Sequence, residues 1–81
     1  MNLNIRLFAT LKELAGASSV QIELEEPSTV ADLLKMIGIK YPNMELSLQS
    51  TLVSVNHEYA DRELLLKSNN EVALFPPVSG G

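Results

Sequence analysis

Only one stretch of this chain has the spacing of a complete amphipathic helix, and it stands between segments that alternate with the period of a β-strand. Four apolar residues fall at positions i, i+3, i+4 and i+7 and so share one helix face, namely Val30, Leu33, Leu34 and Ile37. Ser28 or Thr29 is a suitable N-cap, with Asp32 three residues after the threonine. Gly38 and Pro42 supply the end of the helix. The chain must therefore bury one helix face against a sheet.

Apolar and polar residues alternate in residues 3–9, 20–24, 51–56 and 72–75, which we predict to be strands. The side chains that share the inward parity are Leu3, Ile5, Leu7, Ala9, Val20, Ile22, Leu24, Val53, Val55, Val72 and Leu74. Phe8 and Phe75 have the opposite parity on the first and last strands. Both aromatic rings are therefore expected on the outer face of the sheet.

The first connection is predicted to contain a short helix. Thr10 and Glu13 have the spacing of a capping box, and Gly16 is suited to the left-handed conformation that closes a helix. The apolar residues that this helix would turn inward are Leu11, Leu14 and Ala15.

The later connections carry weaker signals. Residues 43–50 show no clear period and are expected to be an irregular connection. A polar turn is expected at residues 57–58 and another at residues 67–70, where asparagines favour tight backbone conformations. Between these turns the three leucines of residues 64–66 should pack back under the sheet.

This order of elements predicts an α+β fold: a two-layer β-grasp, as in ubiquitin, with a mixed sheet packed on one main helix. The first and last strands of that fold lie side by side at the centre, which would bring Phe8 and Phe75 together. We expect the β-grasp domain to span residues 1–75 and an extended C-terminal tail to span residues 76–81.

Composition excludes several classes of function. With 81 residues, the chain is expected to be one small domain without room for an enclosed active site. The absence of cysteine excludes thiol chemistry and thiolate metal sites. Six scattered cations against ten carboxylates favour a basic protein partner over nucleic acid. No apolar run approaches roughly 18 residues, and the alternating start is unlike a signal peptide, so we expect a cytoplasmic protein away from membranes.

The side chains with catalytic or metal-binding groups are better explained as solvated surface groups. The only histidine, His57, lies in a predicted turn, so neither a metal site nor a catalytic triad is expected. The remaining charged clusters are Glu23, Glu25 and Glu26 on the wet side of a strand, and Asp61, Arg62 and Glu63 in a predicted surface turn.

The C-terminus has a different character from the rest of the chain. After Glu71 no charged side chain follows, and the chain ends Phe-Pro-Pro-Val-Ser-Gly-Gly. Pro76 and Pro77 hold the exit from the sheet extended, because proline fixes φ and cannot donate to a ladder. Gly80 and Gly81 leave the terminal carboxylate without neighbouring side chains, so it could enter a narrow channel. We expect residues 78–81 to be flexible until a partner binds them.

Four segments together resemble one known family. They are residues 8–16 (FATLKELAG), 29–34 (TVADLL), 53–56 (VSVN) and 71–81 (EVALFPPVSGG). In these segments the chain is similar to the small, sulfur-carrier subunits of molybdopterin synthase, along essentially its whole length. A Gly-Gly end is common to all ubiquitin-like carriers and modifiers, whereas the Phe-Pro-Pro-Val-Ser-Gly-Gly ending is much more specific. One departure is Ser68-Asn69-Asn70-Glu71, where the family commonly has Asp-Gly-Asp-Glu.

The resemblance implies a cycle that ends in molybdenum cofactor biosynthesis. An adenylating, E1-like enzyme would use ATP to adenylate the Gly81 carboxylate, and a sulfurtransferase would convert it to a thiocarboxylate (a C-terminal thioglycine). The tail would then enter the large catalytic subunit, where sulfur passes to cyclic pyranopterin monophosphate; Gly80 would give clearance. The chain would bind no cofactor and would be the sulfur-donating subunit of a heterotetramer, not catalytic alone. Residues expected to contact partners are Phe8, Phe75, Pro76, Pro77, Val78 and Ser79.

Two other roles are compatible with the sequence. A ubiquitin-like modifier that forms isopeptide bonds, or a sulfur carrier for thiamin or tRNA, would have the same Gly-Gly end. A plain interaction domain would use the outer face around Phe8 and Phe75, with an inert terminus.

Overall fold

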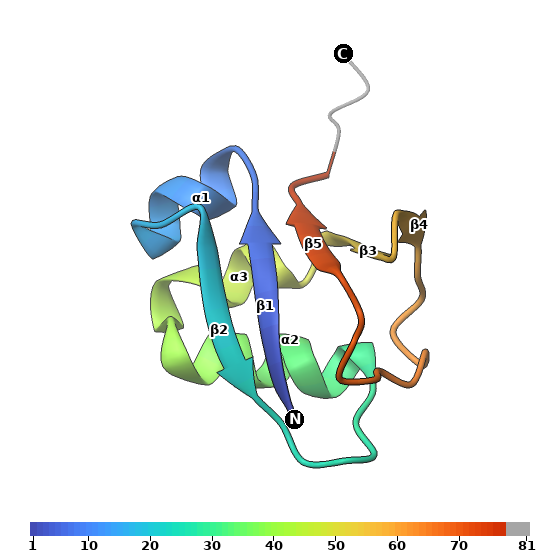
Figure 1. Ribbon diagram of the computed structural model, residues 1–81. Helices are drawn as coiled ribbons and strands as arrows, with labels where there is room; N and C mark the ends of the chain where they lie inside the picture. The colour runs from blue at the N-terminus through green and yellow to red at the C-terminus, as the bar shows by residue number, and fades with distance from the viewer. Residues whose placement is uncertain (78–81) are drawn as a thin grey trace.

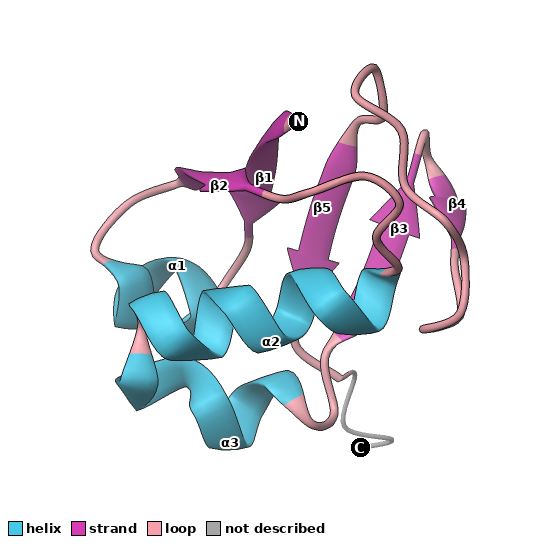
Figure 2. Ribbon diagram, turned by 90° about the horizontal axis from the view of Figure 1, so that it is seen from below, coloured by secondary structure: helices cyan, strands magenta, loops and turns pink. Residues whose placement is uncertain are grey.

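In the computed structural model, which describes residues 1–77, one mixed sheet of five strands carries the helices on one face (Figures 1 and 2). The expected flexibility of residues 78–81 concerns positions outside this range. The elements in chain order are β1 (Asn2–Leu7), α1 (Thr10–Ala15), β2 (Ser19–Glu23), α2 (Val30–Lys40), the 3-10 helix η1 (Pro42–Met44), α3 (Glu45–Leu48), β3 (Leu52–Val55), β4 (Glu58–Tyr59) and β5 (Val72–Phe75). This is the predicted two-layer β-grasp arrangement.

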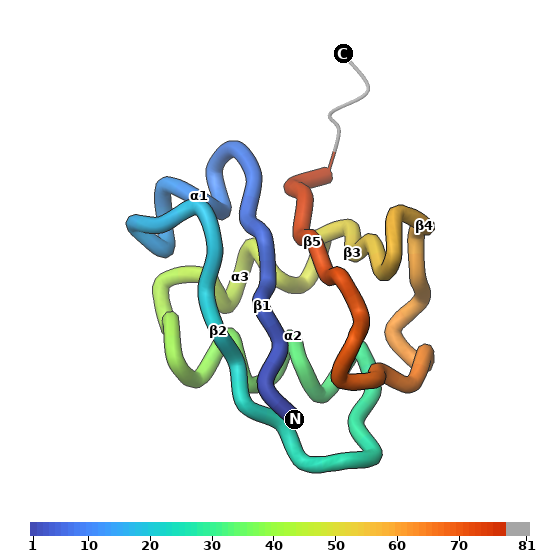
Figure 3. The backbone as a smooth tube through the Cα atoms, in the orientation of Figure 1, coloured from blue at the N-terminus to red at the C-terminus, as the bar shows by residue number. Residues whose placement is uncertain are grey.

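The first and last strands form the centre of the sheet, as predicted. The strand order is β2-β1-β5-β3-β4, and β1 and β5 run parallel while the other pairs are antiparallel. Figure 3 shows strands β1 and β5 side by side, with their C-terminal ends at the same edge of the sheet. Leu7 lies opposite Leu74 in this pair, so Phe8 and Phe75, which follow them in the chain, both lie at that edge.

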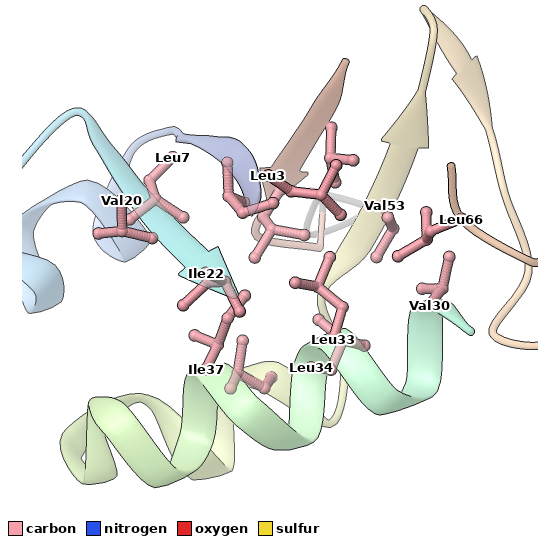
Figure 4. Packing of buried hydrophobic residues seen from close by; sticks show 14 of the residues in the cluster. Leu3, Leu7, Val20, Ile22, Val30, Leu33, Leu34, Ile37, Val53 and Leu66 are labelled. Atoms are coloured by element: carbon pink, nitrogen blue, oxygen red, sulfur yellow. The ribbon is translucent and has the colours of Figure 1, made fainter. Parts of the chain in front are cut away.

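The main helix packs its predicted face on the sheet (Figure 4). Val30, Leu33 and Ile37 have no exposed surface, and Leu34 has 7%. The capping box at the start of α2 is confirmed: the Asp32 backbone N–H donates to Thr29 Oγ1 at 3.2 Å, and the Thr29 N–H donates to Asp32 Oδ2 at 2.9 Å. The predicted inward-facing residues of the strands are all buried except Ala9, whereas Leu14 and Ala15, predicted to face inward from α1, are only half-buried.

The start of α1 differs from the prediction. β1 ends at Leu7, and exposed Ala9 is the N-cap with φ 53° and ψ −127°. The Thr10 capping box does not form, because Thr10 is already inside the helix and no side chain caps it. Gly16 closes the helix in the left-handed conformation, φ 72°, as expected.

Residues 43–50 are not an irregular connection. η1 and α3 occupy most of this stretch, and Met44 and Leu48 are buried at 0% and 5% exposure. These two side chains are four residues apart, which is helical spacing, but α3 has only four residues. So short a segment has no period that a sequence pattern can display.

The region after β3 also differs in detail. The turn lies at Asn56 and His57, both with positive φ, and Glu58 begins strand β4 instead of belonging to the turn. Of the three leucines in residues 64–66, only Leu66 is buried, and Leu64 and Leu65 are exposed. This segment runs beside the start of α2. The Val30 N–H donates to the Leu64 carbonyl oxygen at 3.0 Å.

The turn at residues 67–70 is confirmed. The Asn70 N–H donates to the Lys67 carbonyl oxygen at 3.0 Å, and Asn70 Oδ1 accepts from the Lys67 N–H at 2.6 Å. Neither asparagine there has a positive φ, so the turn depends on the side-chain hydrogen bond. Across residues 1–77, the helices are all too short or too polar to cross a bilayer.

Candidate functional site: an aromatic surface at the exit of the last strand

Phe8 and Phe75 stack on the outer face of the sheet. Their ring centroids are 4.6 Å apart and the ring planes differ by 9°. The parallel pairing of β1 and β5 explains this contact: Leu7 lies opposite Leu74, and each phenylalanine follows with the outward parity. The predicted adjacency of the two rings is confirmed, and both residues are half-buried.

The backbone at Ala9 directs the chain away from Phe8. With φ 53° and ψ −127°, Ala9 adopts a conformation that favours glycine. The chain leaves the sheet at this residue and enters α1, where the Leu11 N–H donates to the Phe8 carbonyl oxygen at 3.1 Å. Phe8 is therefore held by the end of β1 on one side and by the first turn of α1 on the other.

Leu52 and Tyr59 extend the apolar area on the same face. Leu52 is paired with Phe75 in the ladder, and Tyr59 is paired with Ser54 and is 77% exposed. A shallow pocket of about 230 Å³ lies between Tyr59 and Phe75. We name the set Phe8, Leu52, Tyr59 and Phe75 the aromatic surface. Leu52 was not predicted as a site residue, although its parity opposite to Val53 and Val55 indicates the outer face.

The C-terminal tail begins at this surface. Phe75 is both the last residue of β5 and one half of the stacked pair. Pro76 is half-buried and Pro77 is exposed, and neither belongs to a strand. Gly80 and Gly81, the predicted reactive end, and Val78 and Ser79, predicted to contact a partner, lie outside the described residues.

The other candidate groups have structural or solvated roles. His57 Nε2 lies 2.9 Å from Glu71 Oε2, and both side chains are more than 70% exposed, so this pair adds little stability. Within residues 1–77, no group of three histidines and carboxylates is arranged to hold a metal ion. The predicted surface turn at Asp61, Arg62 and Glu63 is confirmed, since all three residues are exposed. Arg62 has an additional structural role there, because its guanidinium donates to carbonyl oxygens at the end of α3.

These features define a ubiquitin-like β-grasp protein with an aromatic surface at the root of its C-terminal tail. The chain belongs to the ThiS family, which matches residues 5–81. A molybdopterin synthase sulfur carrier subunit of Dictyostelium discoideum is 40% identical over 80 residues, which cover 95% of this chain and 93% of that protein.

Solved structures agree on the fold. The crystal structure of SAMP1, a small archaeal modifier protein of Haloferax volcanii, is 31% identical and superimposes with a TM-score of 0.89 over all of both chains. A chain in the Helicobacter pylori complex of subunits 1 and 2 of molybdopterin-converting factor gives a TM-score of 0.70 at 22% identity, again over all of both chains. That second likeness concerns the fold alone.

Proposed function

We propose that this chain is the sulfur carrier subunit of a molybdopterin synthase, with Gly81 as its reactive residue. The observation that carries the proposal is the position of Phe75, which ends the central strand β5, stacks on Phe8 and begins the tail. A protein that covers the aromatic surface therefore also holds the root of the tail. The six residues after Phe75 span at most roughly 20 Å when extended, so the Gly81 carboxylate must react within that distance of the aromatic surface.

The chemistry follows from the functional groups that the chain has. A chain without cysteine can carry activated sulfur on a carboxyl group, and a carboxylate must be activated before it accepts a sulfur nucleophile. In the proposed cycle the Gly81 carboxylate attacks the α-phosphate of ATP on an adenylating enzyme and releases pyrophosphate. Sulfide-level sulfur from the donor then attacks the acyl carbon and displaces AMP, which leaves a thiocarboxylate. When that sulfur is transferred to cyclic pyranopterin monophosphate in the large subunit, water hydrolyses the acyl–sulfur bond and regenerates the carboxylate.

The net charge of this chain indicates which subunit binds the pterin phosphate. This chain has a formal net charge of −4, so it is poorly suited to hold an anionic pterin phosphate. The proposal therefore assigns phosphate binding to the large subunit, and carriage and delivery of sulfur to this chain. The aromatic surface supplies the contact with the large subunit and, in a separate complex, with the adenylating enzyme and sulfurtransferase.

The test is removal of the last residue. A chain that lacks Gly81 should fold and bind the large subunit normally, yet should not be adenylated and should not support molybdopterin formation in a reconstituted assay. Replacing Gly80 with isoleucine should block entry of the tail almost as completely. Molybdopterin formation by the chain that lacks Gly81 would contradict the proposal.

A second candidate function is protein modification, which the likeness to the Haloferax volcanii modifier favours. Purification from the native host followed by intact-mass measurement separates the two functions. A sulfur carrier shows sulfur in place of one carboxylate oxygen, whereas a modifier is found joined to lysines of other proteins. A carrier for thiamin or tRNA thiolation would show the same sulfur but would co-purify without the large subunit.

A further inference from the structure

A positively charged pocket borders the aromatic surface on the side of α1 and β2. It is open, has a volume of about 430 Å³, and is lined by Arg6, Phe8, Lys12, Ser18 and Ser19 among others. The Arg6 guanidinium carbon lies 5.2 Å from the centre of the Phe8 ring, a distance typical of a cation–π contact. The charge of Arg6 is thus held against one half of the stacked aromatic pair.

The cations in this pocket lack carboxylate partners in the described part of the chain. Although the chain has ten carboxylates, neither Arg6 nor Lys12 lies within ion-pair distance of one among residues 1–77. The cross-strand neighbours of Arg6 are Ser19 and Ala73, which are uncharged. Two of only six cations in an acidic chain therefore converge on one pocket.

We propose that this pocket receives a carboxylate side chain, aspartate or glutamate, from the protein that covers the aromatic surface. The inference rests on the function proposed above, in which that protein is the large subunit. A partner that buries Phe8 must also remove water from the guanidinium beside it, and an unpaired charge in a dry interface is strongly unfavourable. The partner must supply an anion at that point.

The residues of the pocket suit a carboxylate. A guanidinium can donate two parallel hydrogen bonds to one carboxylate, Lys12 adds a second positive charge, and the Ser18 and Ser19 hydroxyls add donors. Electrostatic complementarity of this kind fixes the orientation of a complex more than it adds affinity.

The opposite flank of the aromatic surface has another electrostatic character. There His57 lines the pocket beside Tyr59 and Phe75, and its Nε2 lies 2.9 Å from the Glu71 carboxylate. The two flanks therefore differ, with two cations unpaired among residues 1–77 on one side and a carboxylate paired with a histidine on the other, and this asymmetry favours one docking orientation. That orientation determines where the tail enters the partner.

The experiment measures the dissociation constant of the full-length chain with its large subunit at several salt concentrations. The variants are Arg6→Gln, Lys12→Gln and Arg6→Lys, with Lys35→Gln on the exposed side of α2 as the matched control and Phe75→Asp as the test of the aromatic surface. Thermal unfolding of each free variant shows that it is folded. Carbodiimide cross-linking of the wild-type complex, read by mass spectrometry, reports whether Lys12 touches a partner carboxylate.

The expected result is at least tenfold weaker binding of Arg6→Gln with a smaller dependence on salt, a partial recovery in Arg6→Lys, and no change in Lys35→Gln. Lys12 should be joined to an aspartate or glutamate of the large subunit. Wild-type binding by both Arg6→Gln and Lys12→Gln, together with weak binding by Phe75→Asp, would overturn the carboxylate site and leave the proposed function in place. Failure of the wild-type chain to bind the large subunit would overturn both.

Discussion

Arg62 donates from Nη2 to the carbonyl oxygen of Leu48 at 2.9 Å, across fourteen positions of sequence. The same nitrogen lies 3.3 Å from the carbonyl oxygens of Gln49 and Thr51, so one guanidinium contacts three backbone carbonyls at and just after the end of α3. The last carbonyls of a helix have no partner within it, and a cation at that end also complements the helix dipole. Arg62 thereby connects the long segment after β4 to the helix layer.

Replacing Arg62 with alanine should lower the free energy of unfolding by about 1–2 kcal/mol, the lower part of the range for a charged donor because the residue is exposed. Denaturant unfolding measures this change. The matched control is Lys67→Ala, a cation in the turn before β5, which should change stability by less than about 0.5 kcal/mol. Equal effects of the two substitutions would show that Arg62 acts only through its charge.

The two threonines at helix starts should respond differently to alanine. Thr29 accepts a hydrogen bond from the Asp32 N–H, so Thr29→Ala should cost about 0.5–2 kcal/mol of stability. Thr10 lies inside α1 and caps nothing, so Thr10→Ala should be nearly neutral. Thermal or denaturant unfolding of both variants is the measurement, and a comparable loss in Thr10→Ala would contradict the observed start of α1.

Replacing Ala9 with glycine should raise the free energy of unfolding. Its backbone conformation costs an alanine about 1–3 kcal/mol, while the added flexibility of glycine costs about 0.5–1 kcal/mol, so Ala9→Gly should stabilise the domain by up to about 2 kcal/mol. Ala15→Gly, within the same helix, should instead destabilise it. Denaturant unfolding compares the two variants; a clear loss of stability in Ala9→Gly would count against the strained conformation.

Introducing aspartate at Phe8 or Phe75 should weaken association with the large subunit far more than it lowers stability. A stacked aromatic pair contributes about 0.5–1.5 kcal/mol beyond its buried area, a small share of the roughly 5–15 kcal/mol that keeps a domain folded. A charge at the centre of an apolar contact is a much larger penalty for binding. Calorimetric binding and thermal unfolding on the same samples separate the effects; equal losses would identify the rings as core residues.

The reliable predictions came from long, regular patterns. Leu33 and Ile37 repeat with the helix period, and Leu3 and Ile5 with the strand period, so their burial followed from spacing alone. The outward parity of Phe8 and Phe75 likewise located them on one face. The errors fall where a pattern is short or a backbone conformation is unusual, at α3, at β4 and at Ala9.

The sequence by itself determined which faces are apolar, how many layers the domain has and that no charged side chain follows Glu71, because these depend on residue type and on the period of the backbone. The tertiary structure alone decided that Arg6 lies over Phe8, that Tyr59 joins the aromatic surface and that Arg62 holds α3. Each of these contacts joins residues whose distance depends on strand register and on the path of a turn. A one-residue slip in either would move the side chain to the other face of the sheet, and no local pattern specifies that choice.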